Sequence, residues 1–329
     1  METLDRIAVQ EVFNGFVDKR VLVVGDSILD RHVYGEVIGT SLETPTLKLK
    51  HGRTEISYGG AANVVNNILG LGGRVDFITL LGNDQGAEHF RQFKHENLRF
   101  HPVIEPGRTT TVKERTWAMR GNTSYKVLQV DYLDNRDISD KSLKEIRDKF
   151  MQAVQQSYIV LFVDYKHGMM TPTLMRYLQQ CSRRVGKKTI ATFQLSQRDI
   201  KPEDYAGNYL VCMNAKEAKA IDPAFSPDVE FSELERKLKT HICVTLGNKG
   251  SVLYLNGKTY KADAIKVEEK DSCGAGDSFL AALALGDIEK HPIESLYIAN
   301  AWAGLFVQQI GTTVPKKEDL ISMFKNQHG

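Results

Sequence analysis

The sequence predicts an α/β fold in which helices flank a doubly wound, mostly parallel sheet. Runs of consecutive β-forming apolar residues recur along the chain, and a run that is apolar on both faces is typical of a buried parallel strand. Segments with helical spacing of apolar residues lie between these runs, and this alternation indicates one wound sheet. Strands are expected at 20–26, 75–82, 158–164, 188–193, 208–213 and 241–247. Helices are expected at 4–16, 140–156, 173–185, 215–221 and 230–240.

The composition is that of an ordinary globular protein. The chain has 329 residues, of which 42% are hydrophobic and 26% charged, which excludes a disordered chain and a fibrous repeat. The net charge of +2 gives no electrostatic footprint for nucleic acid or a membrane surface, so neither is expected as a partner. The sequence has no apolar run long enough to span a membrane and no CxxC among its 4 cysteines. A cytoplasmic protein with reduced thiols is therefore expected.

Two stretches interrupt the alternation of strands and helices. Residues 32–58 and 100–131 contain segments of period-2 alternation at 46–50, 110–115 and 125–130. Alternation of this kind indicates one buried and one solvated face. We expect a small antiparallel sheet that forms a lid inserted into a single domain, 1–329. Ordinary surface hairpins are the alternative.

The strongest chemical motif is Asp271-Ser272-Cys273-Gly274-Ala275-Gly276-Asp277, which precedes an apolar helical segment. Small residues allow close approach of the backbone, and N–H groups at a helix N-terminus bind anions. The amides of Gly274, Ala275 and Gly276 are thus predicted to form an anion hole. Asp277 stands at its mouth, where a carboxylate can accept the proton of a hydroxyl. The alternative is a glycine-rich turn with a capping aspartate.

Polar residues elsewhere suit the same chemistry. Asp30 and Asn63 are short polar groups near a strand end and a helix start, and they are expected to hold hydroxyl groups of a ligand; a turn and an N-cap are the alternatives. Lys113 and Arg115 alternate along one strand face and could meet a phosphate group, or could lie on a solvated edge strand. No GxxxxGK[ST] motif occurs, no GxGxxG follows a strand, and the histidines show no zinc-binding spacing.

Two of these segments, in order, resemble the signatures of the ribokinase-like, or PfkB, sugar kinases. Residues 271–277 match DxxGAGD, and Gly59-Gly60-Ala61-Ala62-Asn63 lies in a segment similar to GGxxxN. The resemblance extends over about 18–318. It implies a ribokinase-like fold and transfer of the γ-phosphate of ATP to a sugar hydroxyl, with Mg²⁺ as the metal.

The resemblance also implies roles for individual residues. Asn214 and Glu217 match the NxxE motif that is tied to magnesium and phosphate, and Asn300 lies where the family closes on adenine. The segment 245–250 is similar to the TxGxxG nucleotide loop. The implied substrate-binding residues are Asp30, Gly59, Gly60, Asn63, Lys113, Arg115 and Asp164, and the implied nucleotide-binding residues are Asn214, Thr245, Gly247, Gly250 and Asn300.

Within the family, the chain is similar to the heptose-7-phosphate kinases. This similarity rests on the segments 25–31, 41–45, 113–115 and 164–168. The implied reaction is phosphorylation of the anomeric hydroxyl of a heptose 7-phosphate to the 1,7-bisphosphate. Separately, the open sheet edges of the lid need cover, so we expect a homodimer joined through the lids. The chain has no HxGH sequence, so adenylyl transfer is not expected.

Two departures leave alternatives open. Gln194 stands where those kinases show Asp-Pro-Lys, and Gln129 where they tend to have arginine. Another PfkB kinase acting on an unphosphorylated sugar or a nucleoside is one alternative. A non-catalytic sensor of a nucleotide or sugar phosphate is the other.

Overall fold

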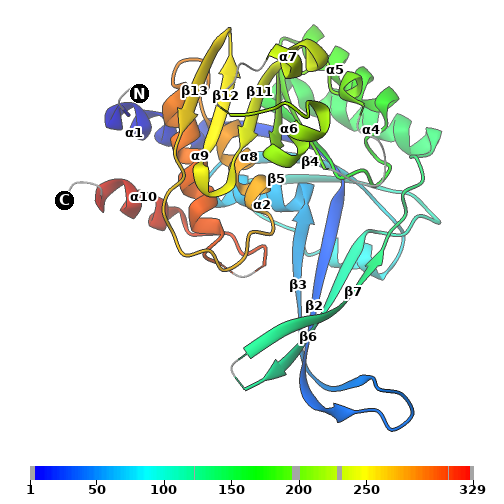
Figure 1. Cartoon of the computed structure of the whole chain (residues 1–329). Helices are drawn as coiled ribbons and strands as arrows, with labels where there is room; N and C mark the ends of the chain where they lie inside the picture. The colour runs from blue at the N-terminus through cyan, green and yellow to red at the C-terminus, as the bar shows by residue number, and fades with distance from the viewer. Residues whose placement is uncertain (1–3, 122, 195–200, 228–231, 310, 327–329) are drawn as a thin grey trace.

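A computed structural model describes residues 4–121, 123–194, 201–227, 232–309 and 311–326, and it confirms the predicted fold class. Helices cover both faces of a nine-stranded sheet with the order β13-β12-β11-β10-β9-β8-β1-β4-β5 (Figure 1). Strands from β11 to β5 are parallel, and β12 and β13 add an antiparallel edge. The strands are β1 Arg20–Gly25, β4 Arg74–Leu81, β5 Leu98–Ile104, β8 Ile159–Asp164, β9 Lys188–Phe193, β10 Leu210–Asn214, β11 His241–Thr245, β12 Ser251–Leu255 and β13 Lys258–Ala262.

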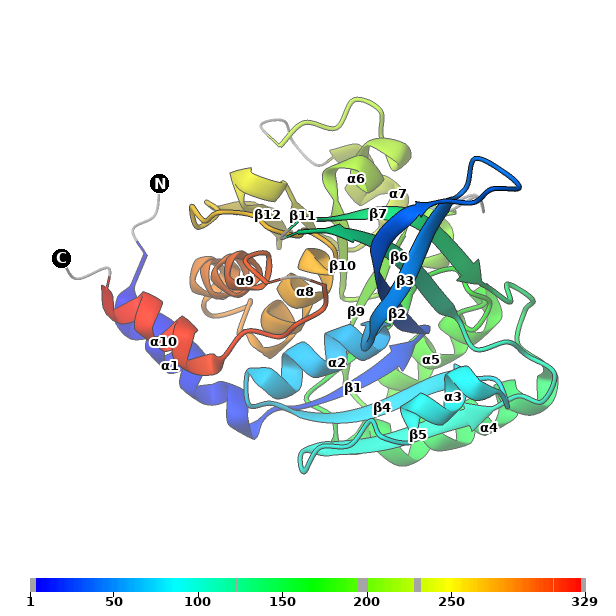
Figure 2. The same ribbon diagram turned by 90° about the horizontal axis from the view of Figure 1, so that it is seen from below.

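Each face of this sheet has its own hydrophobic core. Val21 and Val23 of β1 pack in one core, and Leu22 and Val24 pack in the other, because successive side chains of a strand point to opposite faces. The first core takes side chains from α1 Arg6–Asn14, α2 Ala61–Gly70, α3 Gln85–Phe90, α8 Ala275–Leu285, α9 Pro292–Phe306 and α10 Lys317–Asn326. The second takes them from α4 Asp140–Ala153, α5 Pro172–Arg184, α6 Ala215–Ile221 and α7 Ser232–Leu238. In Figure 2, α1, α2, α8, α9 and α10 of the first group lie on the left, and α4 and α5 of the second group lie on the right.

All the predicted strands of the large sheet are present, and the predicted helices are present with small shifts of their ends. Residues 230–231 of the last predicted helix lie outside the described residues. The sequence analysis missed β5, β12 and β13. The β12–β13 turn is Asn256-Gly257, with φ of 52° and 75°, which is the usual chemistry of a two-residue hairpin turn.

The second sheet has the order β3-β2-β6-β7 and projects from the large sheet (Figure 1). Its strands are β2 Ser27–Thr40, β3 Leu47–Gly60, β6 Val112–Arg120 and β7 Thr123–Tyr132. The expectation of a wholly antiparallel sheet was wrong, since β2 pairs with β6 in parallel. Both hairpins start at the large sheet and run outward, which makes their first strands parallel. Residues 100–104 of the expected lid segment lie in β5 of the large sheet instead.

The small sheet is joined closely to the large one. Asp26 alone separates β1 from β2. Its N–H donates to the carbonyl of Val163 at 3.1 Å, and its carbonyl accepts the N–H of Ala61 at 2.9 Å. The base of the small sheet therefore meets the carboxyl ends of β1 and β8, the edge at which open α/β sheets bind ligands. In the ranges described above, no helix has the length and apolarity needed to cross a membrane.

Candidate active site

Asp277 lies in the first turn of α8, and its side chain is buried, with 8% of the residue exposed. Burial raises the pKa of its carboxyl group to about 6, because a charged carboxylate loses hydration there. Gly274 is the N-cap residue, with φ of 87°, a conformation that glycine adopts without strain. A Cβ atom on Gly274 would lie 2.6 Å from Nδ2 of Asn63, so glycine is also required by space.

Two donors hold the carboxylate of Asp277. Nδ2 of Asn63 donates to Oδ2 at 2.9 Å, and the hydroxyl of Tyr165 donates to Oδ1 at 2.7 Å. Both hydrogen bonds favour the ionised carboxylate and oppose the effect of burial. The predicted base is thus oriented by side chains from α2 and from the loop after β8.

The orientation of the Asn63 amide follows from a buried chain of hydrogen bonds. Nε1 of Trp302 can only donate, and it donates to Oδ1 of Asn67 at 2.9 Å. Nδ2 of Asn67 must then face Oδ1 of Asn63, to which it donates at 3.1 Å. This leaves Nδ2 of Asn63 to face Asp277. Asn63, Asn67 and Trp302 are fully buried, so water does not compete for these hydrogen bonds.

Asp30 and Arg115 form an ion pair between β2 and β6. Lys113 is opposite Asp30 in the register of the small sheet and opposite Asp131 of β7, and it lowers the pKa of Asp277. The predicted substrate-binding residues of the small sheet are therefore close to the predicted base. Gly59 lies beside Asp30, since a Cβ atom there would collide with the Asp30 carboxylate. Gly60, with φ of 60°, turns the chain from β3 into α2.

Asp164, at the end of β8, is held by its neighbours. Its Oδ2 accepts the hydroxyl of Tyr205 at 2.7 Å and pairs with Nζ of Lys166 at 3.0 Å. Its Oδ1 accepts the N–H of Lys166 at 2.8 Å. Burial and the nearby Asp164 raise the pKa of Asp26. Two carboxylates thus share one buried region behind the site.

A pocket of about 80 Å³ opens beside Asp277 at the carboxyl ends of β8 to β11. It brings together residues that the sequence separates widely. Among its lining residues are Asp164, Gln194, Asn214, Glu217, Thr245, Gly276 and Asp277.

Asn214 and Glu217 form a capping box at the start of α6. Oδ1 of Asn214 accepts the N–H of Glu217 at 3.0 Å, and Oε2 of Glu217 accepts the N–H of Asn214 at 2.7 Å. The described residues contain no group of three or more acidic, histidine or cysteine side chains able to hold a metal directly. Mg²⁺ keeps several waters and binds through one or two carboxylates plus phosphate oxygens. The buried carboxylate of Glu217 at the pocket fits that mode of binding.

The remaining predicted nucleotide residues meet at the ends of β11 and β13. Thr245 ends β11, and the loop after it contains Gly247 and Gly250, with φ of 63° and 90°. Nδ2 of Asn300 donates to the carbonyls of Ala262 at 3.0 Å and of Asp263 at 3.3 Å. A Cβ atom on Gly250 would collide with the carbonyl of Ala262. Gly250 and Asn300 therefore both lie beside the carbonyl of Ala262.

Sequence reasoning missed the residues that hold the site from behind. Tyr165 and Asp26 lie in the segments 164–168 and 25–31, but no role was predicted for either of them. Asn67 and Trp302 were not considered. A sequence gives little signal for the last two, because a buried tryptophan or asparagine reads as core or as a helix residue. Asp26 directly after an apolar strand was the one usable signal.

The model of the pfkB family carbohydrate kinases matches residues 18–319 of this chain. Bifunctional protein HldE of Bradyrhizobium diazoefficiens is 29% identical over 327 residues, which is 96% of this chain and 64% of that protein. The protein of the same name from Nitrobacter winogradskyi is 30% identical over 311 residues, covering 92% of this chain and 62% of the relative. The chain thus spans less than two thirds of the length of these relatives.

Solved structures share the fold at lower identity. Arabidopsis thaliana ribokinase complexed with ribose and ATP has a TM-score of 0.67 and 20% identity, covering 93% of this chain and 99% of that one. Escherichia coli phosphofructokinase-2 in complex with substrates and products has a TM-score of 0.72 and 16% identity, covering 94% and 99%. These likenesses confirm the ribokinase-like fold, and the family match covers most of the sequence. The chain belongs to the pfkB family of carbohydrate kinases.

Proposed function

We propose that this kinase transfers the γ-phosphate of ATP to the anomeric hydroxyl of a heptose 7-phosphate, with Asp277 as the general base. The observation that carries the catalytic part is the buried Asp277 carboxylate, held by Asn63 and Tyr165 at the N-terminus of α8. A carboxylate with a pKa of about 6 is ionised at neutral pH and still accepts a proton readily.

In this proposal the sugar hydroxyl approaches Oδ of Asp277 while Asp30 binds neighbouring hydroxyls. The hydroxyl oxygen bonds to the γ-phosphorus, its proton passes to Asp277, and ADP leaves with the bridging oxygen. The amides of Gly274 and Gly276 are assigned to the phosphoryl oxygens, as expected for a helix N-terminus. The N–H of Ala275, which was also predicted for the anion hole, instead donates to the carbonyl of Ser272 at 3.2 Å. Mg²⁺ bound by the nucleotide phosphates near Glu217 and Asn214 would neutralise their charge.

The heptose assignment rests on the local phrases of the sequence and is supported by the likeness to the HldE proteins. A dianionic 7-phosphate requires fixed cations, and Lys113 and Arg115 provide them beside Asp30. The departure at Gln129 lies in register with Arg115, and the departure at Gln194 lines the pocket. Both therefore bear on how phosphate is bound.

A second candidate acceptor is an unphosphorylated sugar or a nucleoside. One observation favours it: Arg115 is already paired with Asp30, so one of the two cations is neutralised within the protein.

Kinetics of Arg115→Ala test the acceptor. In a coupled assay, the variant is expected to raise KM for heptose 7-phosphate more than tenfold and KM for ATP far less, because it removes a guanidinium that grips phosphate at two points. The control is Arg53→Ala, which removes an arginine paired with Glu55 on the outer part of the same sheet. It is expected to leave both constants unchanged.

The same measurement on the matching unphosphorylated heptose separates the two acceptors. If Arg115→Ala raises both sugar constants equally, Arg115 acts only through Asp30, and the phosphate assignment is wrong. Better turnover of plain sugars by the wild type would replace the heptose proposal with the second candidate. Absence of ATP consumption on any sugar would leave the sensor alternative.

The small sheet is proposed to join two subunits. Its outer strands are β3 and β7. On the face opposite Asp30, the register aligns Ile56, Leu128, Val130 and Tyr132, and all of them are exposed. These apolar side chains lie on the two outer strands, on either side of the Arg31–Glu114 ion pair, and exposed apolar groups beside two open sheet edges suit pairing with a second copy.

Light scattering tests this homodimer. The wild type is expected to be dimeric, and Leu128→Glu is expected to be monomeric, because it places a charge among these exposed apolar side chains. Lys126→Glu, a charge reversal on the other face of the same strand, is expected to remain dimeric. A monomeric wild type would refute the proposal.

A further inference from the structure

Tyr165 helps to hold the proposed base, but the groups that fix the loop carrying Tyr165 have no task in the site described above. Its hydroxyl lies 2.7 Å from Oδ1 of Asp277, and burial together with the nearby Asp277 raises its pKa well above the usual value. The hydroxyl therefore stays protonated and donates. The opposite oxygen of the same carboxylate is held by Asn63.

The loop that carries Tyr165 is fixed from below by Asp26. Oδ2 of Asp26 accepts the N–H groups of Tyr165 at 2.9 Å and His167 at 3.3 Å, and Oδ1 accepts that of Met169 at 3.4 Å. Asp26 is 4% exposed, so these contacts are shielded from water. A buried carboxylate that spans alternate amides defines the path of the whole loop.

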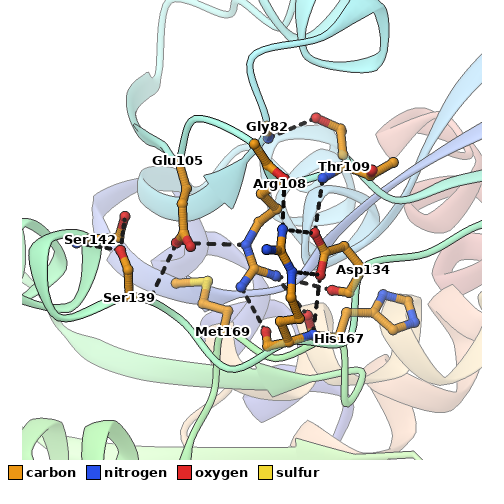
Figure 3. Close-up of polar contacts among 12 residues, drawn as sticks. Gly82, Glu105, Arg108, Thr109, Asp134, Ser139, Ser142, His167 and Met169 are labelled. Carbon is orange, nitrogen blue, oxygen red and sulfur yellow. Dashed lines mark hydrogen bonds and ion pairs between the residues drawn. The ribbon is translucent and has the colours of Figure 1, made fainter.

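Arg108 also binds this loop, at His167 (Figure 3). Its guanidinium donates to the carbonyls of His167 at 3.3 Å, Asp134 at 3.0 Å and Arg136 at 2.7 Å, and it is paired with Glu105 at 3.6 Å. The guanidinium thus joins the loop after β8 to the segment that follows β7. Only arginine has the planar fork of donors that reaches several carbonyls at once.

Gly168 completes the attachment. Its carbonyl accepts the N–H of Ile138 at 3.0 Å. It has φ of 92°, and a Cβ atom there would collide with the carbonyl of Arg136. The loop is therefore bonded to Asp26 and packed closely against the segment that follows β7.

We propose that Tyr165 is a positioning residue: its hydroxyl keeps the carboxylate of Asp277 ionised and aimed, and Asp26 and Arg108 hold the loop that places this hydroxyl. This inference rests on the proposed role of Asp277 as the general base. In this proposal Arg108 also connects the loop to the small sheet, because the segment after β7 accepts hydrogen bonds from the same guanidinium.

Other charged groups also face Asp277. Asp30 of β2 raises its pKa, and Lys113 of β6 lowers it. Cys273 lies in the turn before α8, where burial raises the pKa of the thiol, so this group is neutral near pH 7. None of these is altered by a change at position 165. A shift in the titration of Asp277 on removal of the tyrosine hydroxyl therefore reports the hydroxyl itself.

The first test is the pH dependence of kcat/KM for Tyr165→Phe. Loss of a donor to the carboxylate disfavours its charged form, so the acid limb, near pH 6 in the wild type, is expected to move about one pH unit higher. The matched control is Tyr209→Phe, which removes a tyrosine hydroxyl that donates to Glu289 at 3.0 Å, outside the site. Its acid limb should coincide with that of the wild type. An unshifted limb in Tyr165→Phe overturns the proposal, whatever happens to kcat.

The loop is tested by Arg108→Lys. It is expected to move the acid limb in the same direction as Tyr165→Phe, and the double variant should move it no further than Tyr165→Phe alone, since both act through one hydroxyl. Additive shifts would show that Arg108 acts by another route and would overturn its part in the proposal.

A readout without turnover separates this inference from the proposed function. Carbon-13 NMR of aspartate-labelled enzyme follows the Asp277 carboxyl directly, with Asp277→Asn assigning its signal. The midpoint should rise in Tyr165→Phe and stay in Tyr209→Phe. If the wild type phosphorylates no sugar, the proposed function fails while this titration still decides the contact. If sugars are phosphorylated and the midpoint does not move, the inference alone fails.

Discussion

Asp277→Ala is expected to lower kcat by about 10²–10⁴ and to leave the Kd for ATP nearly unchanged. The variant removes the proposed proton acceptor, and the nucleotide is expected to bind mainly through other residues. Steady-state kinetics and nucleotide titration by calorimetry measure the two quantities. More than a tenth of wild-type turnover in the variant would remove Asp277 from this role.

The pH profile gives the same residue a second signature. The folded-state pKa of Asp277 is raised to about 6, and the base works only when it is deprotonated. Activity should therefore be full well above pH 6 and fall as the pH drops through that value. An acid limb near the ordinary aspartate value of about 4 would mean that another group takes the proton.

Gly274→Ala should lower kcat by about 10²-fold, because a misplacement of about 1 Å in a catalytic group has effects of this size. The new methyl group would lie 2.6 Å from Nδ2 of Asn63 and would displace the amide from Asp277. The hydrogen bonds that connect Asn63 through Asn67 to Trp302 oppose this displacement of the amide.

The control is Gly257→Ala in the turn between β12 and β13. Gly257 has φ of 75°, similar to Gly274, but a Cβ atom there meets nothing within 4 Å. Both variants therefore carry the backbone strain of about 1–2 kcal/mol, and only one carries the collision. Equal kcat in the two variants would show that the contact with Asn63 does not matter for catalysis.

Much of the large sheet could be predicted because its central strands are apolar on both faces. The run at 20–26 reads as a buried strand without any tertiary information, and β1 lies there. The edge strands β5 and β13 were missed because each has a polar face in solvent and so lacks a continuous apolar run. The parallel pairing of β2 with β6 depends on where two distant hairpins start, and no local pattern encodes that.

The site was predictable where one segment carries several of its features. The motif at 271–277 predicts both the anion hole and the role of Asp277, and the family resemblance added Asn214 and Glu217. The contacts between segments could not be read from the sequence. Nothing in the local pattern says that Arg115 pairs with Asp30, or that Trp302 governs the orientation of Asn63 through Asn67.

The register shifts of the small sheet divide it into a stiff root and a pliable tip. They lie between Tyr34 and Gly35, between Val37 and Gly39, and between Thr116 and Trp117. At each shift the ladder of hydrogen bonds is locally disrupted and the strand bends more easily. Asp30, Lys113 and Arg115 lie on the root side of every shift.

The charged groups that face Asp277 are therefore expected to stay fixed relative to the large sheet when the tip of the small sheet moves. We expect deflection to be concentrated in the outer part of the sheet, beyond the groups that handle the reacting proton. The enzyme could then admit an acceptor and release a phosphorylated product by flexing the tip, while the electrostatic environment of Asp277 stays the same from one turnover to the next.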